Sequence, residues 1–360
     1  MSRDLVRSRS APKSRLTKAV VWLALLHYYT LFSGFAAYCL LAARKMKISK
    51  VDFFVLCGLT FLLVMHLTTE SAIDAIHDFR FSWGWVVFYF LFKASIIDRK
   101  VLGATLVILS ALTVVESALV NTVITVENLP NYPKDVPRVT YGLVKTGVYQ
   151  TPYSFGGAPQ VGGPLLVVLM ALCLVQGWKL WLAILAVLAC ASGTGTIVLA
   201  FLLLVKYPGS MGKAIFPLSL TLLVSAFWFL PQAELVWDVV SEKVRWEYIT
   251  FLIDLLAEVA VSVYEQTAPY EFIFGSSGFG HGGDWGILSF WRMNGFLGVL
   301  MFSAMVFTRT NRTNRFPLFL MLTASMHYGA IFFMPGQMIF GLLLSIRERD
   351  CPIMQGRDRV

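Results

Sequence analysis

The sequence predicts an all-α protein, a polytopic helical bundle integral to a membrane, with residues 1–360 forming a single membrane domain. Of the residues, 57% are hydrophobic and 14% are charged, and the mean hydropathy is +0.68. A soluble domain of this length could not bury so much apolar surface, because its own surface must face water. Apolar stretches of spanning length recur along the chain and predict about 10 to 12 spans.

Polar or basic residues bound the apolar stretches and so predict each span in turn. The predicted spans are residues 19–43, 51–69, 83–97, 101–121, 164–178, 180–193, 195–206, 213–231, 285–307, 316–333 and 335–346. Residues 180–205 are long enough for one helix, but the segment ASGTGT at 191–196 predicts a break into two short helices. Broken backbone at membrane depth is tolerated where protein or a water-filled cavity covers it.

Lys and Arg in short loops predict the orientation of the spans. The basic stretches that predict the cytoplasmic side are 44–50, 98–100, 178–179, 206–213, 309–315 and 347–350. Alternation then puts residues 68–82 and two long loops, 122–163 and 232–284, on the outer side. The N-terminal arm is as basic as 44–50, although one predicted span separates them. Either 19–43 is a hairpin pinched at Ser33 and Gly34, or one of the two basic stretches departs from the rule.

The composition and the motifs also exclude several classes of protein. The net charge is +9, and we interpret the basic arm as a cytoplasmic anchor rather than a nucleic-acid-binding segment. Four of the five cysteines lie inside apolar runs and form no CxxC pair, so no disulfide framework is predicted. HExxH, P-loop and Gly-x-Ser-x-Gly motifs are absent, so neither a metal, nor a cofactor, nor a serine nucleophile is predicted.

Five ionisable residues fall within or close to predicted spans, where a charge costs about 2.5–3.5 kcal/mol on insertion scales. They are His66, Lys93, Glu116, Arg292 and His327. Lys93 lies near the cytoplasmic end of its span and can snorkel to the surface. Glu116 is expected either to pair with a basic loop residue or to reach water, and His327 to be a hydrogen-bonded core residue.

The outer loops hold the candidate site residues. They are Arg138 and Lys145 in the first loop, Arg245 in the second, and His281, Asp284 and Arg292 at the closing edge of the second. Guanidinium groups bind phosphate in a bidentate fork, so converging arginines suit a pyrophosphate ligand. An imidazole or a carboxylate nearby can take a proton from an attacking hydroxyl. The alternative is that these charges are solvated and form surface ion pairs worth little.

Four stretches resemble the bacterial O-antigen ligase/polymerase superfamily. The first two are the helix GGAPQVGGPLLVVLMALCL (156–174) and the broken apolar run LAILAVLACASGTGTIVLAFLLL (182–204). The third is EKVRWEYITFLIDLL (242–256), within an amphipathic part of the second loop that predicts helices near the membrane surface. The fourth is FIFGSSGFGHGGDWGILSFWRMNGFLGVL (272–300), with a Gly-x-Gly turn, an acidic residue and then Gly-x-x-Gly.

The resemblance implies a multi-pass protein of the bacterial inner membrane, with both long loops in the periplasm. It implies a metal-independent glycosyltransferase that polymerises undecaprenyl-pyrophosphate-linked repeat units, with a chain-length regulator and a flippase as partners. By position, Arg245 matches the family's phosphate-binding arginine, and Asp284 or His281 matches its catalytic position. The chain departs from the family in having no arginine after Ser192 and a tyrosine eleven residues after Arg138.

Three other functions stay open at this stage. The first is an O-antigen ligase that transfers finished glycan to a lipid A core, although the His-Asn pair common in that branch is absent. The second is a transporter of lipid-linked glycans, which would depend on Lys93, Glu116 and Arg292 and could dispense with the large loops. No internal repeat is evident, which argues against a transporter built from duplicated halves. The third is a structural component of an export complex.

Overall fold

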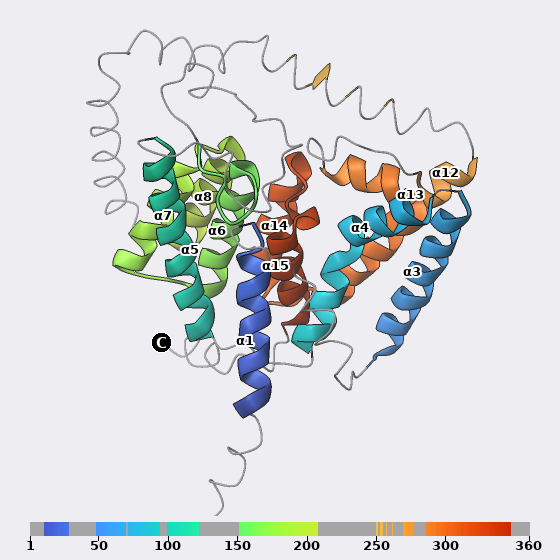
Figure 1. The fold of residues 1–360 in the computed structure, drawn as a ribbon, viewed down its shortest axis with the longest axis horizontal. Coiled ribbons are helices and arrows are strands. Elements are labelled where there is room, and N and C mark those ends of the chain that lie inside the picture. The colour runs from blue at the N-terminus through green and yellow to red at the C-terminus, as the bar shows by residue number, and fades with distance from the viewer. Residues whose placement is uncertain are drawn as a thin grey trace, which may run out of the picture.

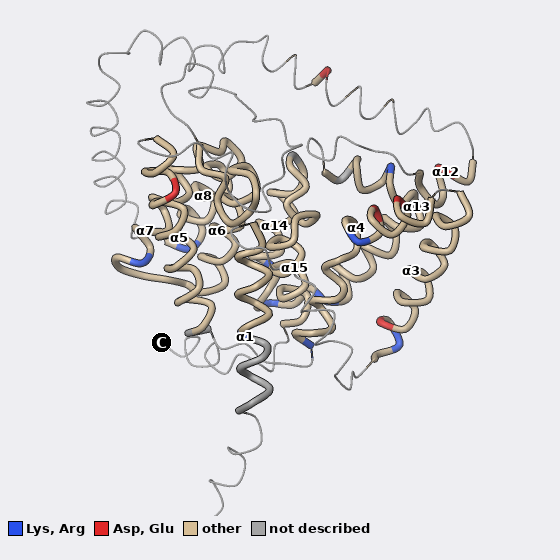
Figure 2. Tube along the Cα trace, viewed as in Figure 1, with Lys and Arg blue, Asp and Glu red and all other residues tan. Residues whose placement is uncertain are grey.

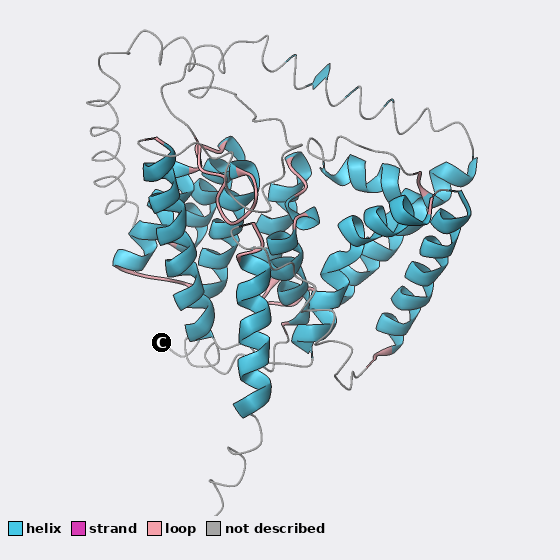
Figure 3. Cartoon of the chain, in the orientation of Figure 1, coloured by secondary structure: helices cyan, strands magenta, loops and turns pink. Residues whose placement is uncertain are grey.

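The computed structural model describes residues 11–28, 48–69, 71–93, 99–121, 151–207, 250, 253–254, 257, 261, 269–276 and 286–346. Within these residues the regular elements are helices (Figures 1 and 3). The elements are α1 (Ala11–Leu25), α3 (Lys50–Thr69), α4 (Ala72–Lys93), α5 (Arg99–Val120), α6 (Pro159–Cys173), α7 (Trp178–Ala189), α8 (Gly193–Lys206), α12 (Pro269–Phe274), α13 (Gly286–Arg309), α14 (Arg315–His327), the 3₁₀ helix η5 (Ala330–Phe332) and α15 (Met334–Ser345).

Within the described residues, three helices are long and apolar enough to cross a membrane. They are α3, the Val101–Val120 part of α5 and the Leu288–Arg309 part of α13. Large apolar side chains on their surfaces are exposed, such as Phe53 and Phe54 of α3 at 64% and 69%. Lipid rather than water suits such surfaces, so the fold indicates a membrane protein. The total of about 10 to 12 spans stays a prediction.

Most predicted boundaries agree with the helices, but the prediction for α4 was wrong. We expected a span over 83–97 preceded by an outer loop at 68–82, whereas the helix runs from Ala72 to Lys93. Ser71 begins it: the Ser71 hydroxyl donates to Asp74 at 2.6 Å, and the Asp74 N–H donates back at 3.2 Å. This capping box starts a helix even though the charged residues that follow lower its hydropathy.

Several helices end together at what we call the basic end, which carries Lys50, Lys93, Lys206, Arg309 and Arg315. Figure 2 shows blue Lys and Arg positions mainly toward the lower ends of the helices, and red Asp and Glu positions mainly toward the upper ends. Lys206 of α8 lies 5.1 Å from the ring centroid of Phe316 in α14, which joins these two helices at that end. Basic residues from several of the stretches predicted to be cytoplasmic therefore lie at one end of the described bundle, and the side of the membrane that this end faces stays a prediction.

Two asparagines connect α13, α14 and α15 at the basic end. The Asn311 side chain donates to the carbonyl of Ile346 at 2.7 Å, and Asn314 donates to the carbonyl of Leu343 at 2.9 Å. Asn314 also donates to the carbonyl of Arg309 at 2.9 Å. These amides donate to carbonyl groups at the ends of α13 and α15, where intrahelical partners run out. The stretch RTNRTNR therefore binds helix ends in addition to carrying positive charge.

The first helix favours one of the two alternatives for the N-terminal region. α1 ends at Leu25 and residues 26–28 form a turn, so 19–43 is not one uninterrupted helix. In Figure 1, α1 and α3 both begin toward the lower side of the bundle. The start of α1 and Lys50 at the start of α3 thus lie on the same side, as the hairpin alternative requires. The predicted pinch at Ser33 and Gly34 lies outside the described residues.

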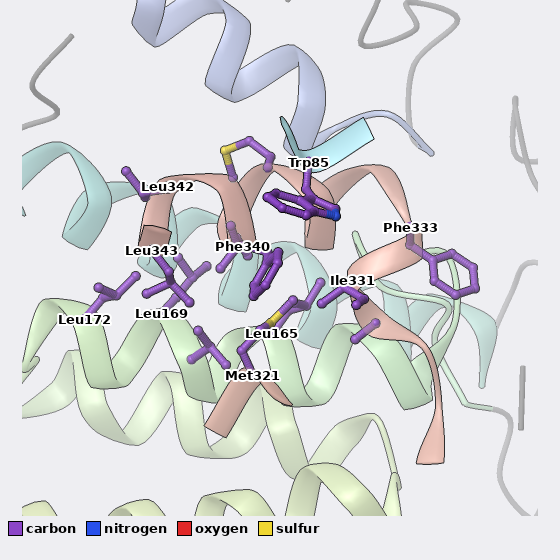
Figure 4. Packing of buried hydrophobic residues seen from close by; sticks show 14 of the residues in the cluster. Trp85, Leu165, Leu169, Leu172, Met321, Ile331, Phe333, Phe340, Leu342 and Leu343 are labelled. Atoms are coloured by element: carbon purple, nitrogen blue, oxygen red, sulfur yellow. The ribbon is translucent and has the colours of Figure 1, made fainter. Parts of the chain in front are cut away.

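The core centres on α15, which packs against α4, α6 and α14. In Figure 4, Phe340 of α15 lies between Trp85 of α4 and Met321 of α14. The rings of Trp85 and Phe340 meet edge to face with centroids 5.1 Å apart. At Gly341 the α15 backbone approaches α4 closely, since a Cβ there would stand 2.6 Å from the carbonyl oxygen of Trp85. Small residues allow such close helix contacts within membrane bundles.

Candidate functional site

Arg292 is the predicted site residue that the structure describes. Asp284, His281, Arg245, Arg138 and Lys145 lie outside the described residues, so their roles stay predictions. Arg292 is half-buried and lies in the first part of α13, at the end of the molecule opposite the basic end. The described positions of the second loop's amphipathic stretch are Thr250, Ile253, Asp254, Ala257 and Val261, and all are helical and exposed.

A bend divides α13 just after Arg292. Gly295 has φ of 60° and ψ of −170°, which are not helical values, so the axis changes direction there. The span predicted over 285–307 agrees with the helix Gly286–Arg309, but the sequence did not predict the bend within it. Hydropathy detects the apolar composition of a segment but not a glycine that turns its backbone.

Polar and aromatic contacts surround the bend. The indole N–H of Trp83 in α4 donates to the side-chain oxygen of Asn294 at 2.6 Å, and the Asn294 amide donates to the carbonyl of Phe290 at 3.0 Å. Both Trp83 and Asn294 are buried. On the other side, the rings of Trp291 and Phe272 lie 5.8 Å apart. The segment that carries Arg292 is therefore held from α4 and from α12.

Glu116, near the end of α5, binds the backbone at the end of the first long loop. Its carboxylate accepts the backbone N–H of Tyr153 at 2.7 Å and that of Ser154 at 3.1 Å. The Ser154 hydroxyl lies 3.1 Å from that of Thr113. Ser154 and Phe155 are buried in non-helical backbone, and buried N–H groups need such acceptors. Glu116 thus fixes the end of the first long loop where it enters the bundle, in addition to any contact with a basic loop residue.

The predicted break in the run 180–205 is confirmed. α7 ends at Ala189 and α8 begins at Gly193, so the break lies at residues 190–192. The Ser192 hydroxyl accepts the N–H of Gly195 at 3.1 Å and caps α8. A Cβ on Gly163, in the first turns of α6, would stand 3.4 Å from the Cβ of Cys190. The tip of the α7–α8 pair therefore packs on the start of α6, beside the end of the first loop.

An ionic cluster at the basic end was missed by sequence reasoning. The fully buried carboxylate of Asp52 forms ion pairs with Lys93 of α4 and with Arg309 of α13, the latter at 2.6 Å. It also accepts the hydroxyl of Tyr89 at 2.8 Å and the N–H of Ser49 at 2.7 Å. Lys93 is therefore buried and paired, rather than snorkelling to the surface as expected. The available signal was an acidic residue in the first turn of a span, three residues after a serine.

Two histidines, His66 and His327, were predicted to lie within or close to spans, and the structure describes the side chain of His66 but not that of His327. His66 is buried near the end of α3, and its Nε2–H donates to the carbonyl of Phe274 in α12 at 3.0 Å. His327 is the last residue of α14, and its side chain lies outside the description. His66 thus connects α3 to the element next to the α13 bend.

The fold and these contacts define an all-helical protein, in its described part, whose apolar helices indicate a membrane environment. Comparison with family models, with curated proteins and with solved structures finds no match to this chain.

Proposed function

We propose that the protein is a multi-pass inner-membrane glycosyltransferase that polymerises undecaprenyl-pyrophosphate-linked oligosaccharide repeat units at the periplasmic face. The product would be a surface polysaccharide such as an O-antigen, a capsule or an exopolysaccharide. In the reaction, a hydroxyl of the acceptor sugar attacks the anomeric carbon of the donor glycan. A new glycosidic bond forms, the bond from the anomeric carbon to the phosphate oxygen breaks, and polyprenyl pyrophosphate leaves.

The candidate residues have two roles in this reaction, proton transfer and phosphate binding. Asp284 or His281 takes the proton of the attacking hydroxyl. Arg245, Arg138, Lys145 and Arg292 bind the pyrophosphate and stabilise the charge that it gains as it leaves. The leaving group is already activated, so the reaction requires no further energy source.

The observation that carries the proposal is the environment of Arg292. This residue lies next to a bend whose flanking backbone is held by α12 and by Asn294, at the end opposite the basic cluster. A guanidinium recognises phosphate well when its backbone is fixed, because little freedom is then lost on binding. Its place is also the closing edge of the second long loop, where the resemblance puts the reaction.

The transporter alternative receives less support from the charges on which it depends. Lys93 is engaged with a buried carboxylate, and Glu116 accepts two backbone N–H groups. Charges with such fixed partners suit the assembly of the bundle better than the binding and release of a moving substrate. No comparable observation favours the ligase or the export-complex alternative.

The experiment is reconstitution of the purified full chain in lipid with a lipid-linked oligosaccharide pool, followed by sizing of the glycan. The variants are Arg245→Ala, Asp284→Ala and Arg292→Ala, and the control is Arg312→Ala, which removes an exposed arginine at the basic end. We expect a ladder from wild type and from the control. Removal of one charge-stabilising donor is expected to slow transfer about 100-fold or more.

The other outcomes separate the alternatives. A single transfer that requires added lipid A core would identify a ligase. Movement of lipid-linked glycan across the membrane without a new glycosidic bond would identify a transporter. If the protein neither forms a glycosidic bond nor moves lipid-linked glycan, a structural role in an export complex remains as the function.

A further inference from the structure

Two glycines bring α12 and the bend of α13 into direct backbone contact. Both have positive φ, 88° at Gly275 and 60° at Gly295. A Cβ on Gly295 would stand 2.5 Å from the backbone nitrogen of Gly275, and a Cβ on Gly275 would overlap the carbonyl of Met293. The atoms in the way belong to backbone and cannot rotate aside. Each position therefore requires glycine for two reasons: the backbone has a positive φ, and there is no room for a side chain.

Hydrogen bonds complete the contact on both sides. The N–H of Ser276 donates to the carbonyl of Arg292 at 2.9 Å, so the residue after Gly275 is bonded to Arg292 itself. The N–H of Gly275 donates to the carbonyl of Glu271 at 2.7 Å and closes α12. We call Gly275, Ser276 and Gly295 the glycine clasp, which is bonded to the backbone carbonyl of Arg292 through Ser276.

The clasp is anchored to a spanning helix. The Nε2–H of His66 donates to the carbonyl of Phe274 at 3.0 Å, directly before Gly275. The ring of Phe61, in the same helix α3, meets that of Phe274 edge to face at 5.5 Å. At its far end α3 is bound through Asp52 to Arg309, the last residue of α13. Helix α3 thus contacts the last residue of α13 at one end and α12, next to the bend of α13, at the other, and the clasp sets the direction of the part before the bend.

We propose that the glycine clasp is a positioning device that fixes Arg292 for binding the pyrophosphate of the lipid-linked substrate. This inference rests on the proposed function, in which Arg292 binds that group. A fork of N–H donors binds phosphate in a defined plane, so a displacement of about 1 Å can cost about 100-fold in rate. Without the bend, the Ser276–Arg292 bond would be lost and Arg292 would take a different position.

The clasp itself is tested by amide hydrogen exchange in the full chain, with no need for activity. Gly275→Ala and Gly295→Ala are compared with two controls. Gly103→Ala places a methyl group where nothing lies within 4 Å, and for Gly58→Ala the nearest atoms belong to the flexible side chain of Met301, in the part of α13 after the bend. We expect exchange at Ser276 to rise about tenfold or more in the clasp variants and to stay unchanged in the controls. Unchanged exchange in the clasp variants would overturn the inference.

The positioning role is tested by the affinity of the protein for undecaprenyl pyrophosphate in nanodiscs. We expect Gly295→Ala to weaken binding about tenfold in the wild-type background and to have no further effect in an Arg292→Ala background. A general structural defect would weaken binding by the same factor in both backgrounds, and that result would refute positioning through Arg292.

The same experiment distinguishes failure of the clasp from failure of the proposed reaction. If wild type binds undecaprenyl pyrophosphate with this pattern of variants but forms no glycosidic bond, the polymerase proposal fails and the clasp stands. If wild type forms glycan ladders while the double variant shows independent effects, the clasp inference fails and the polymerase proposal stands. If wild type does not bind undecaprenyl pyrophosphate, the inference is overturned.

Discussion

Replacing Asp52 with Asn would test whether the ionic cluster at the basic end stabilises the bundle. The substitution keeps the size of the side chain but removes the charge that Lys93 and Arg309 share. Lys93 is 8% exposed and Arg309 is 22% exposed, so neither cation is well placed to recover its solvation. The variant also weakens the cap that Asp52 makes with Ser49.

The structure offers a matched control for the capping part of this effect. Ser71 and Asp74 form a similar contact at the start of α4, in which the Asp74 carboxylate accepts the Ser71 hydroxyl, but Asp74 is exposed. Loss of a cap costs about 0.5–2 kcal/mol in the free energy of unfolding. Breaking a buried ion pair costs about 3–5 kcal/mol, because a charge is left without its partner. Asp52→Asn should therefore destabilise the protein by about 3 kcal/mol more than Asp74→Asn.

The assay is reversible unfolding in mixed micelles, followed by circular dichroism, for wild type and both variants. A third variant replaces Asp52 with Leu, Lys93 with Met and Arg309 with Met, which removes the charges together. We expect it to recover most of the lost stability, because no buried charge then lacks a partner. Equal losses in Asp52→Asn and Asp74→Asn would refute the reasoning, since the cluster would then contribute no more than a surface cap.

Three further substitutions are expected to lower the free energy of unfolding in the same assay. Glu116→Ala leaves the buried N–H of Ser154 and the half-buried N–H of Tyr153 without this acceptor and should cost about 1–3 kcal/mol; a change below about 0.5 kcal/mol would contradict its assigned role. Asn314→Leu removes the donor to Leu343 and Arg309 and should cost about 1–3 kcal/mol, whereas Thr308→Ala, on an exposed site, should be close to neutral. Gly341→Ala forces α15 away from α4 and should cost about 1–3 kcal/mol, while Gly103→Ala should be neutral or stabilising; the opposite order would show that the close contact is unimportant.

Local signals in the sequence predicted much of the helical pattern. The span at 51–69 begins within one residue of α3, because Lys50 and the polar residues after Thr69 bound an apolar run. The break at 190–192 followed from small residues that disfavour a continuous helix. The start of α4 was predicted wrongly because the boundary was placed by hydropathy, although the Ser71 and Asp74 pair that caps the helix was present in the sequence.

The contacts that define the ends of the bundle could not be predicted in the same way. Asp52 meets Lys93 and Arg309 across separations of 41 and 257 residues, which no helical or strand periodicity encodes. The reciprocal contact of Gly275 and Gly295 depends on where α12 packs, so the sequence showed two glycines without their relation. Arg292 was predicted as a site residue from its place after the second loop, but the bend beside it was not.

Stoichiometry in the reconstituted system tests the central claim most directly. Purified wild-type protein in lipid is supplied with lipid-linked repeat units, and released polyprenyl pyrophosphate is counted against new glycosidic bonds. The proposed reaction predicts one pyrophosphate lipid released for each bond formed, and a large loss of both in Arg292→Ala but not in Arg312→Ala. Transfer of lipid-linked glycan between the two sides of the membrane, with neither bond formation nor pyrophosphate release, would contradict it.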